Sequence, residues 1–472
     1  MLHALCKPMK SDLTTKNSTL VFLQGCWDKL WSGPSLHRTT NWIWVLGALA
    51  LMLYAATAMT FDYFGERAKI ILLLCGLFGL VFYSREFLKT PFIWLLIACL
   101  LLQIISWGFS WLYHPEWAEA SPKPSRLARW FMFLPVAWLL GGSLRNVFML
   151  WIIALIGLAA SPWLVKGGVE DLLSAIQGNR ASLGLYNAQH GSLLYGIELL
   201  GLLVFAKRII VGQKYWRIRA CIWLALVCYF SWLFFATQSR GAILGLSLGV
   251  ATALLIMSAI VARRFSRRHR TLFAGMSIGA FMVLLVASLM LVGSITLQRN
   301  QLELEDSEHP LVSVLRGDWD LNPNLSTGIR LNSWREAWPW IKERPLVGWG
   351  GRGRGLVIEN STTLPDRIKS NARHLHNSYL DMLVNFGVFS LVLLAVLMTY
   401  LLVACTKIWN RKQLPTDVYL FFLVFSVFWL IVNMFESFLF YASGLFVFTL
   451  VVGGIVSQIW RAKQLQEQSY SK

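Results

Sequence analysis

Charged side chains are scarce in this 472-residue sequence: Asp, Glu, Lys and Arg make up 14% of it, against about 25% in an ordinary soluble domain. This scarcity excludes a soluble enzyme, a coiled coil and a disordered chain. Acidic residues are scarcer than basic ones: the chain has 24 Asp and Glu against 43 Lys and Arg, which gives a net charge of +19. Because the cations are spread over short loops, we interpret them as orientation signals of a membrane protein and expect no nucleic-acid partner.

Long hydrophobic runs take the place of charge. Hydrophobic residues make up 56% of the chain, and many stretches approach the roughly 20 residues that a helix needs to cross a bilayer. We therefore predict an all-α, polytopic membrane protein with about twelve transmembrane helices. The predicted spans are residues 41–60, 69–83, 91–113, 127–141, 147–164, 191–206, 219–237, 241–262, 272–295, 379–404, 416–434 and 437–460.

The distribution of Lys and Arg predicts how these spans are oriented. With both termini inside, the inner short loops hold 16 basic residues and the outer ones, with the adjoining span ends, hold eight. Cytoplasmic loops are normally the more basic, so both termini are expected in the cytoplasm. All seven cysteines fall in spans or on the inner side, so no disulfide is expected outside. The predicted organisation is a cytoplasmic tail at 1–40, transmembrane helices one to nine at 41–295, a large outer loop domain with short helices at 296–378, helices ten to twelve at 379–460 and a cytoplasmic tail at 461–472.

Two arginines lie at the predicted outer surface of the membrane. Arg180 stands in the loop between the fifth and sixth spans, seven residues before Asn187. Arg240 occupies a loop so short that its guanidinium must lie at or slightly below the membrane surface, which is costly unless it faces water or an anion. We therefore predict a functional role for Arg240. For Arg180 the alternative is an interfacial arginine that reaches to the lipid headgroups.

A histidine pair lies where the long loop meets the tenth span. His374 and His376 are followed by Asn377, Tyr379 and Asp381. Imidazole is the common side chain whose ordinary pKa suits proton abstraction near neutral pH. Zinc is the competing interpretation of a His-x-His pair, but a third ligand close by in the sequence is missing, so we expect no metal. Asp381 is either the carboxylate that orients one imidazole or a plain helix-end carboxylate.

The long loop carries a helix signal of its own. Ser333 and Glu336 match a capping box, which predicts that a short helix begins there. Trp334, Trp338 and Ile341 would then share one face, which we expect to pack against the bundle or the membrane surface rather than on a sugar.

A stripe of small residues follows Arg240. Gly241, Gly245 and Gly249 recur at four-residue spacing. Such a stripe lets a second helix approach closely, so we predict that it packs against another span.

These features together predict a chemistry. Arginine side chains bind pyrophosphate oxygens bidentately. A pyrophosphate held at the membrane surface implies a polyprenyl-diphosphate lipid, and a nearby histidine implies deprotonation of an acceptor hydroxyl. The sequence therefore predicts glycosyl transfer with a lipid diphosphate as the leaving group.

The order of these motifs resembles the O-antigen ligase and O-antigen polymerase superfamily of bacterial envelope glycosyltransferases. The matching motifs, which lie within residues 178–390, are Arg180…Gly184…Asn187, Ser239-Arg240-Gly241-Ala242, Arg330…Trp334…Pro345-Leu-Val-Gly348 and His374-x-His376-Asn377-x-Tyr379-Leu380…Gly387. The flanking helices match only in hydropathy. The resemblance implies a metal-independent, inverting transferase without a cofactor, built as a glycosyltransferase C-like bundle in the bacterial inner membrane, with the large loop in the periplasm.

In the ligases of this superfamily, a glycan moves from undecaprenyl diphosphate to the lipid A–core at the periplasmic face. The resemblance implies that Arg180 and Arg240 hold the diphosphate. It also implies that His376 is the base and that His374 assists it, although the family's histidine matches either imidazole. It also argues against a metal at Asp318 and Asp320, which have an acidic D-x-D form. The residues expected to bind diphosphate or substrate are Arg180, Arg240, Arg330, Asn187, Asn377 and Tyr379.

The acceptor stays open at this point. A ligase donates to lipid A–core, a polymerase to the growing lipid-linked glycan, and a third relative to protein serines. We favour the ligase because the long loop holds eleven Lys and Arg, which suits a phosphorylated core oligosaccharide; the other expected partners are the lipid-linked glycan and membrane lipids. A transporter would predict several midspan charges and an internal repeat, whereas Glu198 is the only good midspan candidate.

Overall fold

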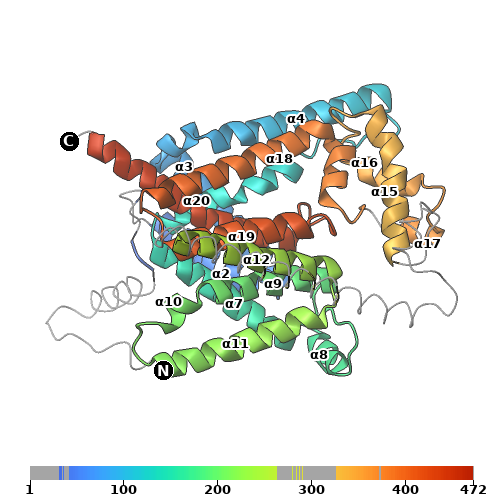
Figure 1. The fold of residues 1–472 in the computed structure, drawn as a ribbon. Helices are drawn as coiled ribbons and strands as arrows, with labels where there is room; N and C mark the ends of the chain where they lie inside the picture. Colours follow the sequence, from blue (N-terminus) through green and yellow to red (C-terminus); the bar gives the residue numbers. More distant parts are fainter. Residues whose placement is uncertain are drawn as a thin grey trace, which may run out of the picture. The chain divides into compact units, whose positions relative to one another are not determined.

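The computed structural model describes residues 31–33, 36, 42–262, 279, 283, 286, 290, 326–371 and 374–470. Every regular element in these ranges is helical, which confirms the all-α prediction for them (Figure 1). Most of the predicted N-terminal tail, nearly all of the span at 272–295 and the acidic pair Asp318 and Asp320 lie outside the described residues. The chain divides into two compact units, each assembled from separate stretches of sequence.

The first unit combines residues 1–88, 133–157 and 450–472. Its core forms where α2 packs against α3 and both meet α6. Gly76 lies so close to Pro135 that an added Cβ would come within 2.4 Å of the proline Cβ. The indole of Trp138 donates to the Ser84 hydroxyl at 3.0 Å. The described elements that lie wholly in this unit are α2 (Trp42–Thr57), α3 (Asp62–Tyr83) and α6 (Phe133–Leu140), and all of η2 (Arg85–Lys89) except Lys89 belongs to it.

The second unit combines residues 89–132 and 158–449 and contains every candidate site residue. Within it α4 runs beside α18, α12 beside α19, and α9 beside α11, while α15 and α16 pack at the N-terminal end of α18 (Figure 1). Its elements are α4 (Pro91–Tyr113), α5 (Ser125–Ala128), η3 (Arg129–Met132), α8 (Gly168–Ile176), α9 (Ala188–Val204), α10 (Ala206–Ile210), α11 (Trp216–Ala236), α12 (Arg240–Ala262), α15 (Ser326–Glu343), α16 (Gly353–Glu359), α17 (Asp366–Asn371), α18 (Ser378–Asn410) and α19 (Thr416–Val432). Two further helices, α7 (Leu144–Leu164) and α20 (Ala442–Tyr470), continue from one unit into the other.

Six of the described helices are long and apolar enough to cross a bilayer, which identifies a multi-pass membrane protein by length and composition. The shorter apolar helices α2 and α19 correspond to two more of the predicted spans. The full number of about twelve spans, their orientation and the domain boundaries stay predictions. The six candidate spans are Pro91–Tyr113, Leu144–Leu164, Trp216–Ala236, Arg240–Ile260, Ser378–Asn410 and Ala442–Ser469.

The segment predicted as a span at 127–141 is broken. The chain passes from the short α5 through the 3-10 turn η3 into α6, which has eight residues. Eight helical residues reach about 12 Å, short of the roughly 30 Å hydrocarbon core. Pro135 has no N–H to donate to the carbonyl four residues earlier, in η3, and Gly141 ends the helix with φ 61°. The α-helix is therefore interrupted by a 3-10 turn within this predicted span, and whether the segment crosses the membrane stays a prediction.

The glycine stripe of α12 packs as predicted. A Cβ added to Gly241 would lie 2.5 Å from the Phe435 ring, and one added to Gly245 would lie 3.1 Å from the Phe428 ring. Both aromatic residues belong to α19 or to the turn after it. The stripe thus brings the start of α12, which carries Arg240, against the segment that carries Glu436.

The loop helix does not begin at the predicted capping box, because α15 already begins at Ser326. Ser333 lies inside the helix, where its hydroxyl donates to the Ile329 carbonyl at 2.6 Å. The Glu336 carboxylate instead accepts the Thr363 N–H at 2.9 Å and its hydroxyl at 2.6 Å. The motif's two side chains therefore have other partners, and Glu336 ties α15 to the segment before α17.

A small apolar core holds α15, α16 and the start of α18 together. Ala337, Ile341 and Leu375 are buried in it, and Trp334 packs against it. Trp338 is 54% exposed, so the predicted common face holds for Trp334 and Ile341 but not for Trp338. Because Leu375 separates the two histidines in sequence, this core fixes the backbone of the pair.

Candidate active site

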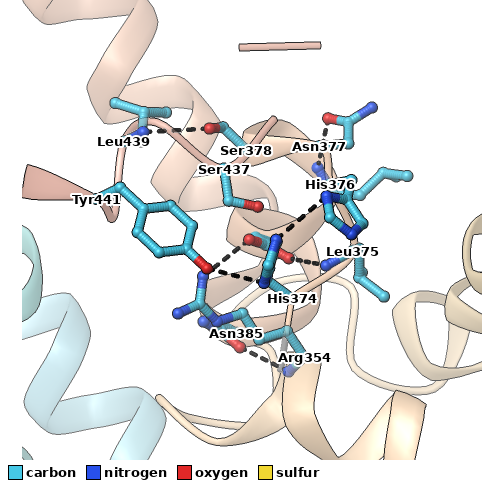
Figure 2. A network of polar contacts seen from close by, with 12 residues as sticks. Arg354, His374, Leu375, His376, Asn377, Ser378, Asn385, Ser437, Leu439 and Tyr441 are labelled. Carbon is cyan, nitrogen blue, oxygen red and sulfur yellow. Dashed lines mark hydrogen bonds and ion pairs between the residues drawn. The ribbon is translucent and has the colours of Figure 1, made fainter. Parts of the chain in front are cut away.

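Both histidines converge on one buried carboxylate. Glu436, in the turn between α19 and α20, has a side chain that is 2% exposed. His374 Nε2 lies 3.0 Å from Glu436 Oε1, and His376 Nδ1 lies 3.0 Å from Oε2. On its other side, His374 Nδ1 lies 2.9 Å from the Tyr441 hydroxyl, which points at the ring in Figure 2.

The partners favour one arrangement of the ring hydrogens, in which His374 Nε2 and His376 Nδ1, 3.2 Å apart, share the Glu436 carboxylate. An ionised carboxylate only accepts hydrogen bonds, so His374 Nε2 and His376 Nδ1 both donate to Glu436. His374 Nδ1 then accepts from Tyr441, which uses both nitrogens of that ring. His376 Nε2 is left as a basic lone pair with no hydrogen-bond partner among the described residues. The geometry therefore distinguishes the two imidazoles, which the sequence did not.

Electrostatics favour a charged glutamate beside neutral imidazole. Burial would raise the pKa of the Glu436 carboxyl, but hydrogen bonds from His374 and His376 hold that pKa well below its usual range. Burial lowers the pKa of His376, and the positive charge of Arg330 acts in the same direction, while the hydrogen bond with Glu436 and its negative charge oppose them. His376 is therefore neutral at pH 7, the state that a base requires.

Asp381 supports the backbone between the two rings. It is fully buried, accepts the Leu375 N–H at 3.0 Å and pairs with Arg354 at 2.8 Å. Neither imidazole is its partner, so Asp381 is neither the orienting carboxylate nor a plain helix-end charge. His376 has φ 51°, a left-handed conformation that non-glycine residues rarely adopt. The Asp381 contacts stabilise that turn.

The structure brings the two predicted diphosphate arginines onto adjoining loops. Arg180 Nε donates to the Thr237 carbonyl at 3.1 Å, three residues before Arg240. The N–H of Ala181 donates to the Ala236 carbonyl at 3.0 Å, which joins the same two loops. Arg180 is exposed, whereas Arg240 is partly buried.

Arg240 and Arg330 both adjoin the first turn of α15. Arg240 Nη2 donates to the Thr327 hydroxyl at 3.2 Å, and Arg330 follows Thr327 by three residues, on the same face of the helix. With its amide oriented to satisfy both neighbours, Gln189 accepts from Arg330 and donates to Glu436. A polar chain thus runs from the arginines to the carboxylate between the histidines.

The remaining predicted residues occupy supporting positions. The side chain of Asn187 caps α9 by accepting the Gln189 N–H at 2.8 Å. Asn377 caps α18 by accepting the Tyr379 N–H at 3.0 Å, while the Tyr379 hydroxyl donates to the Leu430 carbonyl at 2.6 Å. These contacts position helix starts beside the site; direct substrate contact by these three residues stays a prediction.

The cluster also has the composition of a metal site. His374, His376 and Glu436 each offer a ligand atom, and these atoms lie within 4.8 Å of one another. The third ligand that the local sequence lacked is therefore supplied from 60 residues away. Each of these atoms also takes part in a hydrogen bond or ion pair within the cluster.

Sequence reasoning missed Glu436, Tyr441 and Arg354. The signal for Glu436 was present: a carboxylate stands in the turn between two apolar segments, 416–434 and 437–460, where a charge is costly unless it is paired. Its partners lie far away in the sequence, so no local motif linked them. Gln189 stood within the Arg180 motif, but nothing in the sequence assigned its amide a role.

Part of the chain is similar to a known protein family. Residues 224–395 match the family model described as O-Antigen ligase. The match covers Arg240, α15 and both histidines, but it does not reach Arg180 or Glu436. No curated protein matches the chain at a significant level. Over these residues the chain is therefore similar to the family described as O-Antigen ligase.

Proposed function

We propose that this protein is an O-antigen ligase of the bacterial inner membrane. It would transfer a glycan from undecaprenyl diphosphate to a hydroxyl of lipid A–core at the periplasmic face, by inverting and metal-independent transfer. The observation that carries this proposal is the hydrogen-bond pattern of the histidine pair, which leaves His376 Nε2 as a neutral base. Glycosyl transfer to a hydroxyl needs such a base beside a site for the leaving diphosphate.

In the proposed reaction, the acceptor oxygen attacks the anomeric carbon from the face opposite the diphosphate. The bond between that carbon and the diphosphate oxygen breaks, and the electron pair leaves with undecaprenyl diphosphate. The acceptor proton moves to His376 Nε2, and Glu436 stabilises the resulting imidazolium through Nδ1–H. The buried carboxylate makes His376 a better base than its burial alone would allow.

The arginines would stabilise charge that grows on the leaving group. Preorganised cations at such a position commonly supply a large part of the rate enhancement. Arg180 and Arg240 lie on loops joined by hydrogen bonds. Gln189 forms hydrogen bonds with both Arg330 and Glu436, so it links Arg330 to the carboxylate that contacts His376. Together these contacts support one site for both diphosphate and base.

The choice of a ligase over a polymerase rests on the basic composition of the long loop. The test is reconstitution of the full-length protein in liposomes with undecaprenyl-diphosphate-linked glycan, with or without lipid A–core, and with EDTA. We expect EDTA-resistant glycan on the core and none without it. Lengthening of the lipid-linked glycan in the absence of core would instead identify a polymerase, and loss of transfer with EDTA would identify a metal enzyme at the His–Glu cluster.

Two variants make this test specific to the proposed base. His376→Gln should abolish transfer. His114→Gln, at a partly exposed histidine that contacts Glu116, should transfer like the wild type. If neither acceptor receives glycan from the wild-type protein, while the labelled lipid-linked glycan crosses the bilayer, the protein is a transporter.

A further inference from the structure

A second concave surface of this protein lies away from the histidines, between the end of α4 and the segment that follows α15. We call it the Arg344 groove: a cavity of about 350 Å³ lined by Phe109, Tyr113, Arg344, Pro345, Leu346 and Val347. Apart from Arg344, its lining is apolar or aromatic. All these residues belong to the second unit.

The floor of the groove is fixed to α18. The Val388 N–H donates to the Pro345 carbonyl at 2.8 Å, and the Phe389 N–H approaches the Leu346 carbonyl at 3.4 Å. At the kink in α18, Gly387 has φ 66°, and a Cβ there would come within 2.1 Å of the Leu346 carbonyl. This close fit means that the groove is preformed.

The groove lies beside the end of one candidate membrane span, α4. Tyr113 ends one candidate span, and the floor is bonded to another, α18. Tyr113, Leu346 and Phe389 are 61%, 55% and 47% exposed. Aromatic side chains at the end of a span are typical of the membrane interface. Exposed apolar side chains at this level suit contact with a lipid chain.

Arg344 places a positive charge in the groove and forms no ion pair with a carboxylate of the described residues. Its guanidinium lies 4.2 Å from the centre of the Trp349 ring and 5.7 Å from that of Tyr113. Its Nη1 is buried without a hydrogen-bond partner, and no carboxylate among the described residues is within ion-pair distance. The neighbouring Glu343 is exposed, where solvent screens its charge. A buried donor of this kind is costly until an acceptor reaches it.

We propose that the Arg344 groove binds an anionic glycerophospholipid, with the phosphate on Arg344 and an acyl chain against Phe109, Tyr113 and Leu346. A phosphate oxygen satisfies the guanidinium with a charge-assisted hydrogen bond, while the apolar wall excludes water from the chain. A headgroup of net negative charge is favoured over a zwitterionic one because the groove lining contains no carboxylate to receive an amine. This site is separate from the proposed transfer site and does not depend on its function.

The occupied groove would stabilise the loop that supports the histidines. Beyond Leu346 the chain reaches Trp349, whose backbone N–H donates to the Val384 carbonyl at 2.9 Å. It then reaches Arg354, which forms an ion pair with Asp381. A lipid bound to Arg344 would therefore stabilise the segment from Leu346 to Arg354, which leads to the candidate site. We expect it to raise thermal stability as well as to bind.

The test is native mass spectrometry of the full-length protein in detergent, titrated separately with phosphatidylglycerol, phosphatidylcholine and a polyprenyl phosphate. Phosphatidylglycerol should bind more tightly than phosphatidylcholine and raise the melting temperature. Arg344→Gln should weaken phosphatidylglycerol binding about tenfold, the loss expected for one charge-assisted hydrogen bond. Arg352→Gln, at an exposed arginine paired with Glu359, should bind like the wild type.

A second variant covers the case in which Arg344→Gln does not fold. Leu346→Glu adds a negative charge at an exposed position of the groove, so it should reduce phosphatidylglycerol binding and leave phosphatidylcholine binding nearly unchanged. Equal binding of the two phospholipids to the wild type, or unchanged phosphatidylglycerol binding in a folded Arg344→Gln or Leu346→Glu variant, would overturn the proposal. So would polyprenyl phosphate that displaces phosphatidylglycerol in an Arg344-dependent manner. Because binding is measured without transfer, the result does not depend on whether the protein is a ligase.

Discussion

The histidine half and the arginine half of the candidate site are built differently. Glu436 is buried and bonded to both imidazoles, and Tyr441 completes the partners of His374. Arg180 is exposed, and Arg240 is held to α15 through a threonine hydroxyl. The proposed base is therefore preorganised by buried hydrogen bonds, whereas Arg180 lies in an exposed loop and Arg240 begins α12 beside that loop. We expect substitutions in the two halves to change the transfer rate and its pH profile in different ways, and four variants test this.

The largest effect is expected at His376. His376→Gln removes the only ring nitrogen of the pair that is available as a base, and general base catalysis contributes roughly 10²- to 10⁴-fold. We expect a loss of about 10³-fold or more in transfer rate, measured in proteoliposomes, with unchanged affinity for lipid-linked glycan. A rate close to that of His114→Gln would show that His376 is not the base.

A smaller loss is expected at Arg240. Arg240→Lys keeps the positive charge but removes the bidentate fork. Because the arginine is proposed to act on charge in the transition state, kcat should fall about 10²-fold. The matched control is Arg208→Lys, at an exposed arginine that pairs with Asp417. Equal activity of these two variants would remove Arg240 from the diphosphate site.

At Glu436 the pH profile is the decisive measurement. Burial lowers the pKa of His376, so the acid limb of the wild-type rate profile should lie below pH 6.5, the ordinary value for imidazole. The Glu436 carboxylate raises the pKa of His376, so Glu436→Gln should move that limb to still lower pH. It should also slow transfer about tenfold, because the imidazolium loses its counter-charge.

The control for this variant is Glu359→Gln, at an exposed glutamate paired with Arg352, which should leave both rate and profile unchanged. An acid limb that stays in place in Glu436→Gln would contradict the proposed coupling. A shift to higher pH would contradict its sign.

The smallest effect is expected at Tyr441. Tyr441→Phe removes the hydroxyl that donates to His374 Nδ1 at 2.9 Å, and His376 keeps its contact with Glu436. Loss of one neutral hydrogen bond corresponds to about a fivefold change in rate. Tyr229→Phe, which loses a hydroxyl bonded to the Ala159 carbonyl, is the control. A loss as large as that of His376→Gln would mean that Tyr441 itself contacts a reacting group.

Several features could be predicted from the sequence because they depend on local chemistry. Helices at Pro91–Tyr113 and Ser378–Asn410 follow from long apolar runs, and the close approach of α12 to α19 follows from glycine spacing. The capping box at Ser333 failed, because side chains that fit a local motif can find better partners elsewhere, as Glu336 does at Thr363.

The sequence by itself determined the membrane character, the helical class and the types of residue that meet at the site, because hydropathy and side-chain chemistry are properties of the chain alone. Only the tertiary structure decided which imidazole nitrogen is left without a hydrogen-bond partner among the described residues. That choice depends on Glu436 and Tyr441, which lie 60 and 67 residues from their histidine partners. A hydrogen bond depends on atoms within about 3 Å of one another, and positions along the sequence do not specify that proximity.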